Sequence, residues 1–458
     1  MAKKAKKTET AKQGLVCVQP DTAGIDIAKD VIQVCVPSDR DANYNREFGA
    51  FTEDLHAISA WLKKCGIKRV IMESTGIYWV QLFFILDKDG FEAVLVNPCE
   101  VKNMNARKSD VNDAEWLLFI GSHDLYRNSF HLSWWMTDLK SLSRHRDTLK
   151  GDAAREIQHM QKAMELMNIK LSSVISDITG ESGMNIVKAI LAGERDADKL
   201  AALANYRCRK SREEIAKALC GTWNRVNLLQ LKQALAMYES KLEQIQECEK
   251  EMEKILKENL NQSESEEMPF KRQGKDKSKK SSVHLDIERM AYDAWHTNVM
   301  SIPGISDSSV LRLLSELGPD FVAKFPSPKK FCRWCNVAPR DSVSGGKVLS
   351  CHLQKRGSVV GQVFRQAATT LRNHKSPLGI YYRKMKSRSG AVQANVSVAH
   401  KLAEIFYSMV KNRTMYKEEI TTQNEGERVL LKLKRLEKEK LKIENKLAAL
   451  GIPTPAVI

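Results

Sequence analysis

The chain has 458 residues, enough for two or three domains that each bury a core. Its formal net charge of +17 and pI near 9.3 favour a polyanionic partner, most simply nucleic acid. No stretch approaches the ~20 uninterrupted apolar residues of a membrane span, and the lysine-rich start lacks the apolar run of a signal peptide. The ten cysteines show no disulfide-like spacing, so we expect a reducing, intracellular setting.

After a flexible basic tail at residues 1–20, residues 21–138 are predicted to form an α/β domain. AGIDIA and VIQVCV are typical of two strands joined by a tight turn at Lys29–Asp30. The segment DLHAISAWLKKCG then predicts a helix, and KRVIME predicts a strand. A helix at 77–89 and the strand FEAVLV follow. Strands that alternate with helices indicate a three-layer domain.

Four acidic residues of this domain form a candidate site. Asp26 and Glu73 each follow apolar residues, so their carboxylates are expected at strands or strand ends, where the sites of open sheets lie. Asp110 and Asp113 are three residues apart at a predicted helix start and therefore share one face. Taken singly, Asp26 also fits a turn residue and Asp110 a helix N-cap. Together the four carboxylates predict a site for divalent cations and phosphodiester chemistry.

The middle of the chain, residues 139–260, is predicted to be helical. The run LLQLKQALAMYESKLEQIQECEKEMEKIL has apolar residues near heptad spacing with many charged neighbours, which favours a coiled coil. Residues 261–291 are polar and end in a basic run, so we interpret them as a disordered linker that could also touch nucleic acid.

A second, mainly helical domain is expected at 292–415, followed by a charged helical tail at 416–458. NVMSIPGISDSSVLRLLSELG resembles a helix-hairpin-helix element, whose glycine lets the backbone approach a phosphate, although a turn between packed helices also explains it. A Gly- and Ser-rich loop with basic residues follows, within 336–372. Cys332 and Cys335 have zinc-ligand spacing, but their apolar surroundings favour a core position.

Three blocks of the sequence resemble the DEDD insertion-sequence transposases: GIDIAKD, MESTGIYW, and NP followed eight residues later by RKSDVNDAE. Residues 292–415 resemble the C-terminal domain of the same family. The resemblance implies a RuvC-like (RNase H-like) fold for the first domain, with Mg²⁺, or Mn²⁺ in its place, as the metal. It also implies a recombinase of donor and target DNA that is guided by a structured, non-coding bridge RNA.

The resemblance also implies roles for particular residues. Asp26, Glu73, Asp110 and Asp113 would hold the metal, and Ser344 falls on the position of the nucleophile in the segment PRDSVSGGK. Ser342 is a nearby rival, separated from Ser344 only by alignment to the glycines. Six basic residues are candidate phosphate or nucleic-acid contacts: Arg107, Lys108, Arg340, Lys347, Lys355 and Arg356.

Two other functions compete with a recombinase. A structure-specific endonuclease of the Holliday-junction resolvase type would use the four acids for attack by water, without a covalent intermediate. A nucleic-acid-binding scaffold built on coiled coils would not need the acids. We expect a homo-oligomer, a dimer or a tetramer, in the bacterial cytoplasm at the nucleoid, without contact to a membrane.

Overall fold

The structure, a computed structural model, describes residues 16–73, 76–96, 113–126, 133–260, 283–355 and 357–418, with scattered positions between 430 and 444. The chain divides into two compact units, Met1–His131 and Leu132–Ile458. Most of the expected N-terminal tail and most of the expected C-terminal tail lie outside the described residues.

The first unit contains a five-stranded mixed sheet in the order β3-β2-β1-β4-β5. The central strand β1 is antiparallel to β2 and parallel to β4, and β5 continues the parallel half. The alternation of strands and helices that the sequence predicts is therefore confirmed. The elements are β1 (Thr22–Ile27), β2 (Val31–Cys35), β3 (Asn45–Gly49), α2 (Thr52–Lys64), β4 (Arg69–Glu73), α3 (Trp79–Lys88), β5 (Glu92–Val96) and α5 (Asp113–Ser122).

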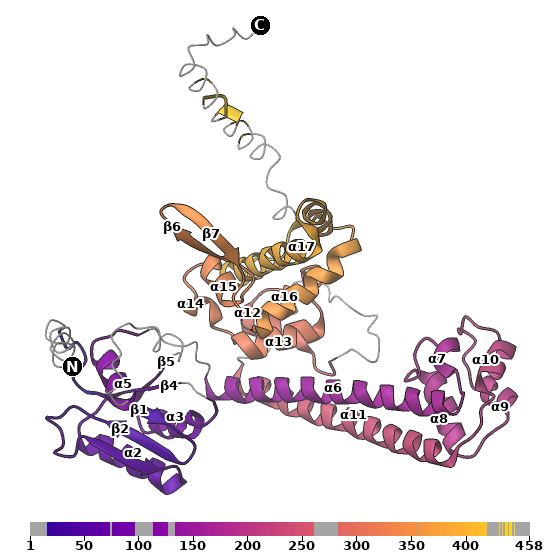
Figure 1. The fold of residues 1–458 in the computed structure, drawn as a ribbon, viewed down its shortest axis with the longest axis horizontal. Coiled ribbons are helices and arrows are strands. Elements are labelled where there is room, and N and C mark those ends of the chain that lie inside the picture. Colours follow the sequence, from indigo (N-terminus) through magenta and orange to yellow (C-terminus); the bar gives the residue numbers. More distant parts are fainter. Residues whose placement is uncertain are drawn as a thin grey trace. The chain divides into compact units, whose positions relative to one another are not determined.

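Helices cover both faces of this sheet, with α5 on one face and α2 and α3 on the other (Figure 1). Ile71, Val94 and Val96 pack against Trp116 and Leu117 of α5. Because strand residues alternate between faces, the buried side chains next to them in β4 and β5 point to the side of α2 and α3.

The edge strand β3 has no counterpart among the predicted strands. Its sequence NREFG has only one large apolar residue, and all five of its residues are at least partly exposed. A short, charged strand at a sheet edge lacks the apolar signal by which strands are recognised. Its pairing with β2 holds it in place.

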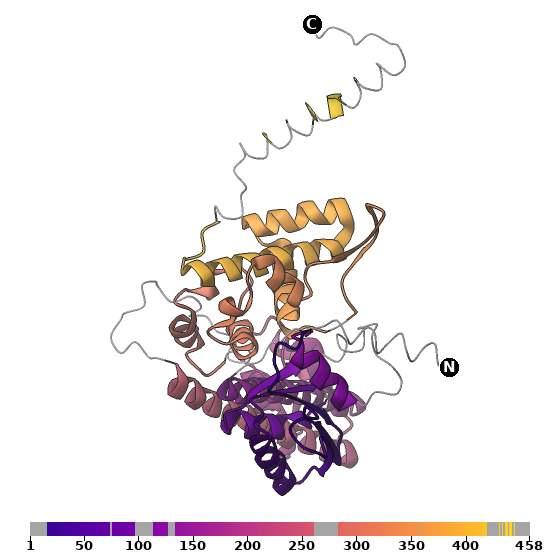
Figure 2. The same ribbon diagram turned by 90° about the vertical axis from the view of Figure 1, so that its left-hand side faces the viewer.

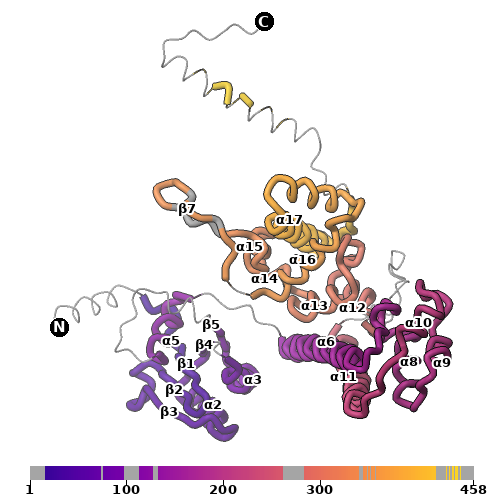
Figure 3. Tube along the Cα trace, turned by 45° about the vertical axis from the view of Figure 1, so that its right-hand side comes forward, coloured from indigo at the N-terminus to yellow at the C-terminus, as the bar shows by residue number. Residues whose placement is uncertain are grey.

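The second unit begins with two long antiparallel helices, α6 (Trp134–Leu166) and α11 (Arg225–Asn259), drawn in Figures 1 and 3. Four short helices between them form a tip with its own apolar core, which includes Met160, Ile186 and Leu235. The expected helical region is thus present, although α6 begins at Trp134, ahead of residue 139. Met136 and Leu139 are both buried, so the first turns of α6 already carry apolar anchors. The tip helices are α7 (Leu171–Val174), α8 (Glu181–Leu191), α9 (Ala197–Ala202) and α10 (Arg212–Leu219).

From residue 283 to residue 418, where the structure describes it, the rest of the second unit is mainly helical and includes a β-hairpin. Its core is aromatic: Phe321 contacts the rings of Phe331 and Phe406, and Trp295 packs edge-on against Phe406. The elements are α12 (Ile287–Trp295), a 3₁₀ turn (Val299–Ser301), α13 (Asp307–Leu317), α14 (Phe321–Lys324), α15 (Pro328–Trp334), β6 (Arg340–Ser344), β7 (Lys347–His352), α16 (Val359–Thr370) and α17 (Pro377–Asn412).

One expectation for this region needs correction. The linker expected at 261–291 ends earlier, because Val283, Leu285 and Ile287 are buried and lead directly into α12. Residues 261–282 lie outside the described residues. The turn between α12 and α13 does contain a glycine with positive φ, Gly304. A Cβ atom there would lie 2.8 Å from the carbonyl oxygen of Ala367, so this glycine permits close packing against α16, in line with the alternative of a turn between packed helices.

A buried ion pair joins the two long helices near α13. Arg146 of α6 and Glu249 of α11 are 2% and 1% exposed, and their charged groups are 2.6 Å apart. Glu249 also accepts hydrogen bonds from the backbone and ring nitrogens of His284, at 2.9 and 2.6 Å. Glu249 therefore fixes the point at which the chain enters the C-terminal helical part, directly after the segment 261–282.

Substitution of Arg146 by methionine is expected to lower the free energy of unfolding by about 3–5 kcal/mol, because Glu249 would keep a buried charge without its main partner. The double variant Arg146→Met/Glu249→Leu should lose clearly less. Arg155→Met is the matched control on the same helix, since its pair with Asp152 is exposed, and it should cost less than ~1 kcal/mol. Denaturant unfolding followed by circular dichroism measures all three, and equal losses for Arg146→Met and Arg155→Met would contradict the expectation.

Candidate active site

Asp26 and Glu73 are neighbours at the carboxyl ends of two parallel strands. In the pairing of β1 with β4, Ile25 lies opposite Met72, so Asp26 and Glu73 are the next residues in the same register. Neighbouring strands lie ~4.8 Å apart, and paired residues share one face of the sheet. Both acids are half-buried. The two carboxylates therefore belong to one site.

The helix α5 begins with Asp113 on this same face. Gly24 shares the face of Asp26, and a Cβ atom at Gly24 would come within 2.1 Å of the Ala114 carbonyl oxygen. At the other end of the helix, Gly121 faces the first residue of β1. Helix α5 therefore runs antiparallel to β1, with its amino end toward Asp26.

The amino end of α5 also contributes an electrostatic effect. The partial positive charge of a helix amino terminus stabilises carboxylates nearby. Asp113 in the first turn is half-buried, and Glu115 accepts a hydrogen bond of 3.1 Å from the side chain of Asn45 in β3. The hydrogen bond to Asn45 connects the first turn of α5 to the far strand of the sheet.

Of the four predicted acids, the structure brings three together on one face of the sheet, at the carboxyl ends of β1 and β4. These are Asp26, Glu73 and Asp113. Asp110 lies outside the described residues, as do Arg107 and Lys108. Within the described residues, no group of three or more His, Cys, Asp or Glu is close enough together to hold a metal ion. Mg²⁺ is commonly held by only one or two carboxylates together with substrate phosphates, so Asp26, Glu73 and Asp113 still offer a suitable set of oxygen donors.

The sequence did not indicate Gln33, a further residue next to the acids on this face of the sheet. It lies opposite Asp26 in the pairing of β1 with β2, and it is partly exposed. Its side-chain amide can donate a hydrogen bond to a carboxylate beside it. Gln33 is identified only by the pairing register of β1 and β2, which cannot be deduced from the sequence around Gln33.

Substitution of Gly24 by alanine is expected to displace α5, because the added Cβ atom would overlap the backbone of the helix. We expect a loss of ~1–3 kcal/mol in unfolding free energy and a fall of about 10- to 100-fold in any activity that depends on the carboxylate site, since a shift of ~1 Å in a catalytic group is that costly. Gly151→Ala is the control, because a Cβ atom at this position of α6 meets nothing within 4 Å. Unfolding and activity assays on both variants check this, and full activity in Gly24→Ala would show that α5 does not need to lie so close to β1.

The segment with Ser344 forms a β-hairpin and not the loop that the sequence predicts. Ser344 pairs with Lys347 across a two-residue turn of Gly345 and Gly346, whose φ values are 55° and 76°. Positive φ at both positions is typical of the hairpin turn that glycine pairs favour. A Cβ atom on either glycine would meet nothing within 4 Å. The hairpin projects from the helical body of this unit, and both Ser344 and Lys347 are exposed (Figures 1 and 2).

The rival serine has a different place in the hairpin. Ser342 pairs with Ser350, two residues back from the turn, and the strand register is irregular between Ser342 and Val343. Ser344, by contrast, is the last strand residue before the bare glycine turn. The unobstructed glycine turn thus lies directly beside Ser344 and not beside Ser342.

Basic residues surround the hairpin in the sequence. Lys355 is exposed, Arg340 begins β6, and Arg356 lies outside the described residues. A wider pattern was missed: no Asp or Glu occurs between Asp341 and Glu404, whereas eleven Lys and Arg do. Four of these, all exposed, lie in the first half of α17: Arg383, Lys384, Lys386 and Arg388. Such a one-sided charge suits the phosphate backbone of nucleic acid.

The two cysteines with zinc-like spacing lie in the core. Cys332 and Cys335 are both fully buried, and burial, with the nearby charge of Glu404, raises the pKa of the Cys332 thiol to about 12. The Cys332 sulfur also approaches the backbone carbonyl oxygen of His400, at 3.8 Å.

The Cys332 thiol is therefore expected to resist alkylation in the folded protein between pH 7 and 9, because the reactive thiolate forms only near pH 12. Over the same range the thiols of Cys17 and Cys220 should be labelled faster than Cys332, because both are exposed to the reagent. Iodoacetamide labelling followed by peptide mass spectrometry measures each site. Labelling of Cys332 at pH 8 at the rate of Cys220 would contradict its burial.

Carboxylates on adjacent parallel strands, together with a strongly basic helical part, suit a protein that acts on nucleic acid. Two family profiles match this chain. One, for DEDD transposases of the IS110 type and described as "Transposase", matches residues 23–169. The other, described as "Transposase IS116/IS110/IS902 family", matches residues 296–383. No curated protein matches the chain.

The chain therefore belongs to the IS110 family of DEDD transposases, as the resemblance of its sequence blocks predicts. This makes it an enzyme that processes DNA. Within the part of the chain that the structure describes, no helix is long and apolar enough to cross a membrane.

Proposed function

We propose that this transposase cuts and rejoins DNA strands to excise and insert an insertion sequence, with Asp26, Glu73, Asp110 and Asp113 as metal ligands. The observation that carries this proposal is the placement of Asp26 beside Glu73, with the amino end of α5 on the same face. The strand order β3-β2-β1-β4-β5, with an antiparallel first half and a parallel second half, supports a RuvC-like assignment of the sheet.

The donor set consists of carboxylate oxygens, which suits Mg²⁺, with Mn²⁺ as an alternative. A bound divalent ion would supply electrostatic stabilisation of the charge that develops on the phosphate oxygens. The contribution of the chain is to hold the carboxylates in place. The register of β1 and β4 fixes Asp26 and Glu73, and the close packing at Gly24 fixes the start of α5.

Ser344 is the proposed nucleophile. Its hydroxyl oxygen attacks the phosphorus, the bond from phosphorus to one deoxyribose oxygen breaks, and the hydroxyl proton passes by way of a base to the departing oxygen. The phosphoserine ester keeps the energy of the phosphodiester, so a deoxyribose hydroxyl of another strand can reverse the step and reseal the DNA. Lys347 is the proposed phosphate contact, and its pairing with Ser344 across the turn supports this assignment.

The two parts of this proposed site come from different compact units. The acids belong to Met1–His131 and Ser344 belongs to Leu132–Ile458. We propose that both parts act on the same DNA, either from one chain or from two protomers of a dimer or tetramer. Recombination by mixtures of a Ser344→Ala chain and an Asp26→Asn chain would distinguish these arrangements, because only a site shared between protomers is restored in the mixture.

We also propose that a structured bridge RNA selects the donor and target DNA. The formal charge of +17 and the acid-free segment between Asp341 and Glu404 support a large nucleic-acid partner. The DNA beside the coding region tests the proposal. A structured non-coding stretch, with loops complementary to the ends of the element and to its target, is expected there, and its absence would favour an unguided enzyme.

The chemistry is tested by trapping. DNA that carries the ends of the element is incubated with the protein and Mg²⁺, denatured with detergent and examined for a covalent protein–DNA adduct. A recombinase gives an adduct that yields phosphoserine on acid hydrolysis and that does not form with a chelator. An endonuclease that uses water gives cut DNA without an adduct, and this result would replace the proposed mechanism with hydrolysis.

A further inference from the structure

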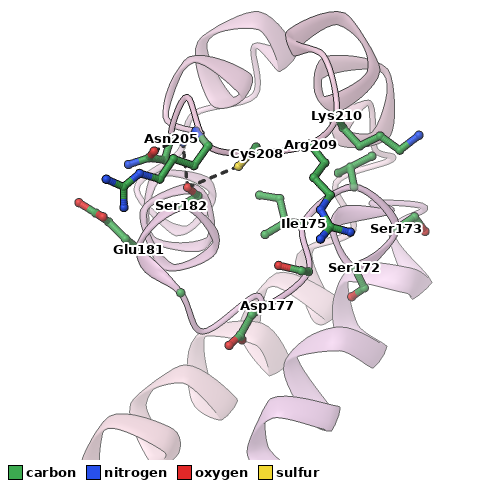
Figure 4. A pocket seen from close by; sticks show the side chains of 14 residues that line it. Ser172, Ser173, Ile175, Asp177, Glu181, Ser182, Asn205, Cys208, Arg209 and Lys210 are labelled. Atoms are coloured by element: carbon green, nitrogen blue, oxygen red, sulfur yellow. Dashed lines mark hydrogen bonds between the residues drawn. The ribbon is translucent and has the colours of Figure 1, made fainter. Parts of the chain in front are cut away.

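The tip of the long helical pair contains a polar pocket that the proposed chemistry does not use. The pocket has a volume of about 620 Å³ and lies between two segments, 172–182 and 205–210 (Figure 4). Its walls carry hydroxyl, amide and carboxylate groups. Those of the first segment include Ser172, Ser173, Ser176, Asp177 and Glu181.

The second segment gives the pocket a basic side. Arg207, Arg209 and Lys210 all line it and all are exposed. Lys210 forms an ion pair of 2.9 Å with Glu214. Arg209 extends into the opening between the two segments, and its guanidinium group has no ion pair with any residue that the structure describes (Figure 4). A planar guanidinium in this position suits a phosphate group.

The two walls are held at a fixed separation. The backbone amide of Asn205 donates a hydrogen bond of 2.9 Å to the Ser182 hydroxyl, and the Cys208 sulfur approaches the same hydroxyl at 3.8 Å. Ser182 is 8% exposed, so this connection is buried. Helix α8 begins at the pocket wall, and its N-cap residue, Gly180, provides no side chain to cap the first amides. Amides at a helix start add to the attraction for a phosphate on the basic side.

An aromatic residue, Tyr206, lies in the chain between two lining residues of the pocket, Asn205 and Arg207. Tyr206 is 85% exposed, which is unusual for a large ring. The guanidinium of Arg207 lies 5.4 Å from the ring centre, and its Nε donates a hydrogen bond of 3.1 Å to the Tyr206 hydroxyl. An exposed ring with basic neighbours is the arrangement on which unpaired bases stack.

We propose that this pocket binds an unpaired nucleotide of a nucleic-acid strand. Arg209 and Arg207 contact the phosphates on either side, and Tyr206 stacks on a base. Asp177 and Glu181 disfavour a free, doubly charged phosphate, but they can accept hydrogen bonds from base amino groups or sugar hydroxyls. This site goes beyond the proposed strand chemistry, because none of its residues belongs to the acids or to the hairpin.

The full-length protein is tested with a single-stranded 12-mer that carries one 4-thio-substituted pyrimidine, in DNA and RNA forms of the same sequence. Irradiation should cross-link the strand to residues of 205–210, as read by peptide mass spectrometry. Binding constants are measured at several salt concentrations, and the slope of log K against log salt gives the number of phosphate contacts. The double variant Arg207→Ala/Arg209→Ala should reduce the magnitude of this slope by about 1.4, because each phosphate contact on a single strand contributes ~0.7. Tyr206→Ala should weaken binding about tenfold.

Lys217→Ala/Lys232→Ala is the matched control, since it removes the same charge from exposed positions outside the pocket. Equal salt dependence in the two double variants, or cross-links confined to residues outside 172–182 and 205–210, would overturn the proposal. A duplex that binds and cross-links as well as the single strands would overturn the preference for an unpaired nucleotide. Tighter binding of the RNA or of the DNA form identifies the source of the strand. These measurements do not depend on DNA cleavage, so they can be interpreted even if the proposed strand chemistry is wrong.

Discussion

Asp26→Asn and Glu73→Gln are each expected to lower strand cleavage and adduct formation by at least about a thousandfold, equivalent to ~4 kcal/mol of transition-state stabilisation. Each change removes one negative charge from a pair of neighbouring carboxylates while the side chain keeps its size. A neutral amide is a poor ligand for a divalent cation in comparison with a carboxylate. DNA binding should stay within about twofold of the unchanged protein, because the basic residues remain.

The matched control for this pair is Glu92→Gln. Glu92 lies at the amino end of β5, at the opposite edge of the sheet, where it pairs with Arg69. The same loss of charge there should leave cleavage within about threefold. Single-turnover cleavage at several Mg²⁺ concentrations measures all three variants. Cleavage by Asp26→Asn at the level of Glu92→Gln would exclude Asp26 as a ligand and would favour the non-catalytic scaffold.

The sequence predicted the strands that carry the site because their signals are local. Apolar runs end at Asp26 and at Glu73, and both residues lie at or near the carboxyl ends of their strands. The order of the strands and their register depend on contacts between distant segments, which a single sequence does not display. Gln33 and Gly24 were missed for that reason: the first belongs to the site by strand pairing, and the second by the approach of a helix ninety residues away in the chain.

The hairpin at Ser344 shows the opposite case, a local signal that was not used. Two glycines between short segments with valines are a recognised hairpin pattern. The many serines and basic residues around them favoured a loop. The segment after residue 282 is similar, since the polar run before it concealed the apolar anchors Val283 and Leu285. In both places the prediction followed the polar composition of the segment, although a few apolar residues in it indicated ordered structure.

Ser344→Ala is expected to abolish the covalent adduct and to lower recombination by about 10⁴-fold or more, the scale seen when a catalytic nucleophile is removed. Binding of DNA should be unchanged, because Ser344 is exposed and the loss of its hydroxyl group does not affect the backbone pairing of the hairpin. Adduct trapping and product analysis on a gel measure both effects.

Ser342→Ala is the control that gives this experiment its meaning. It removes the same hydroxyl from the same strand, two residues farther from the glycine turn, and should keep adduct formation within about threefold. If Ser342→Ala loses the adduct and Ser344→Ala keeps it, the nucleophile is Ser342. The turn would then position a phosphate for a residue farther from the tip of the hairpin. If both variants still recombine, neither serine forms the covalent bond. Cleavage without an adduct in the unchanged protein would then identify the acids of the sheet as a complete hydrolytic site.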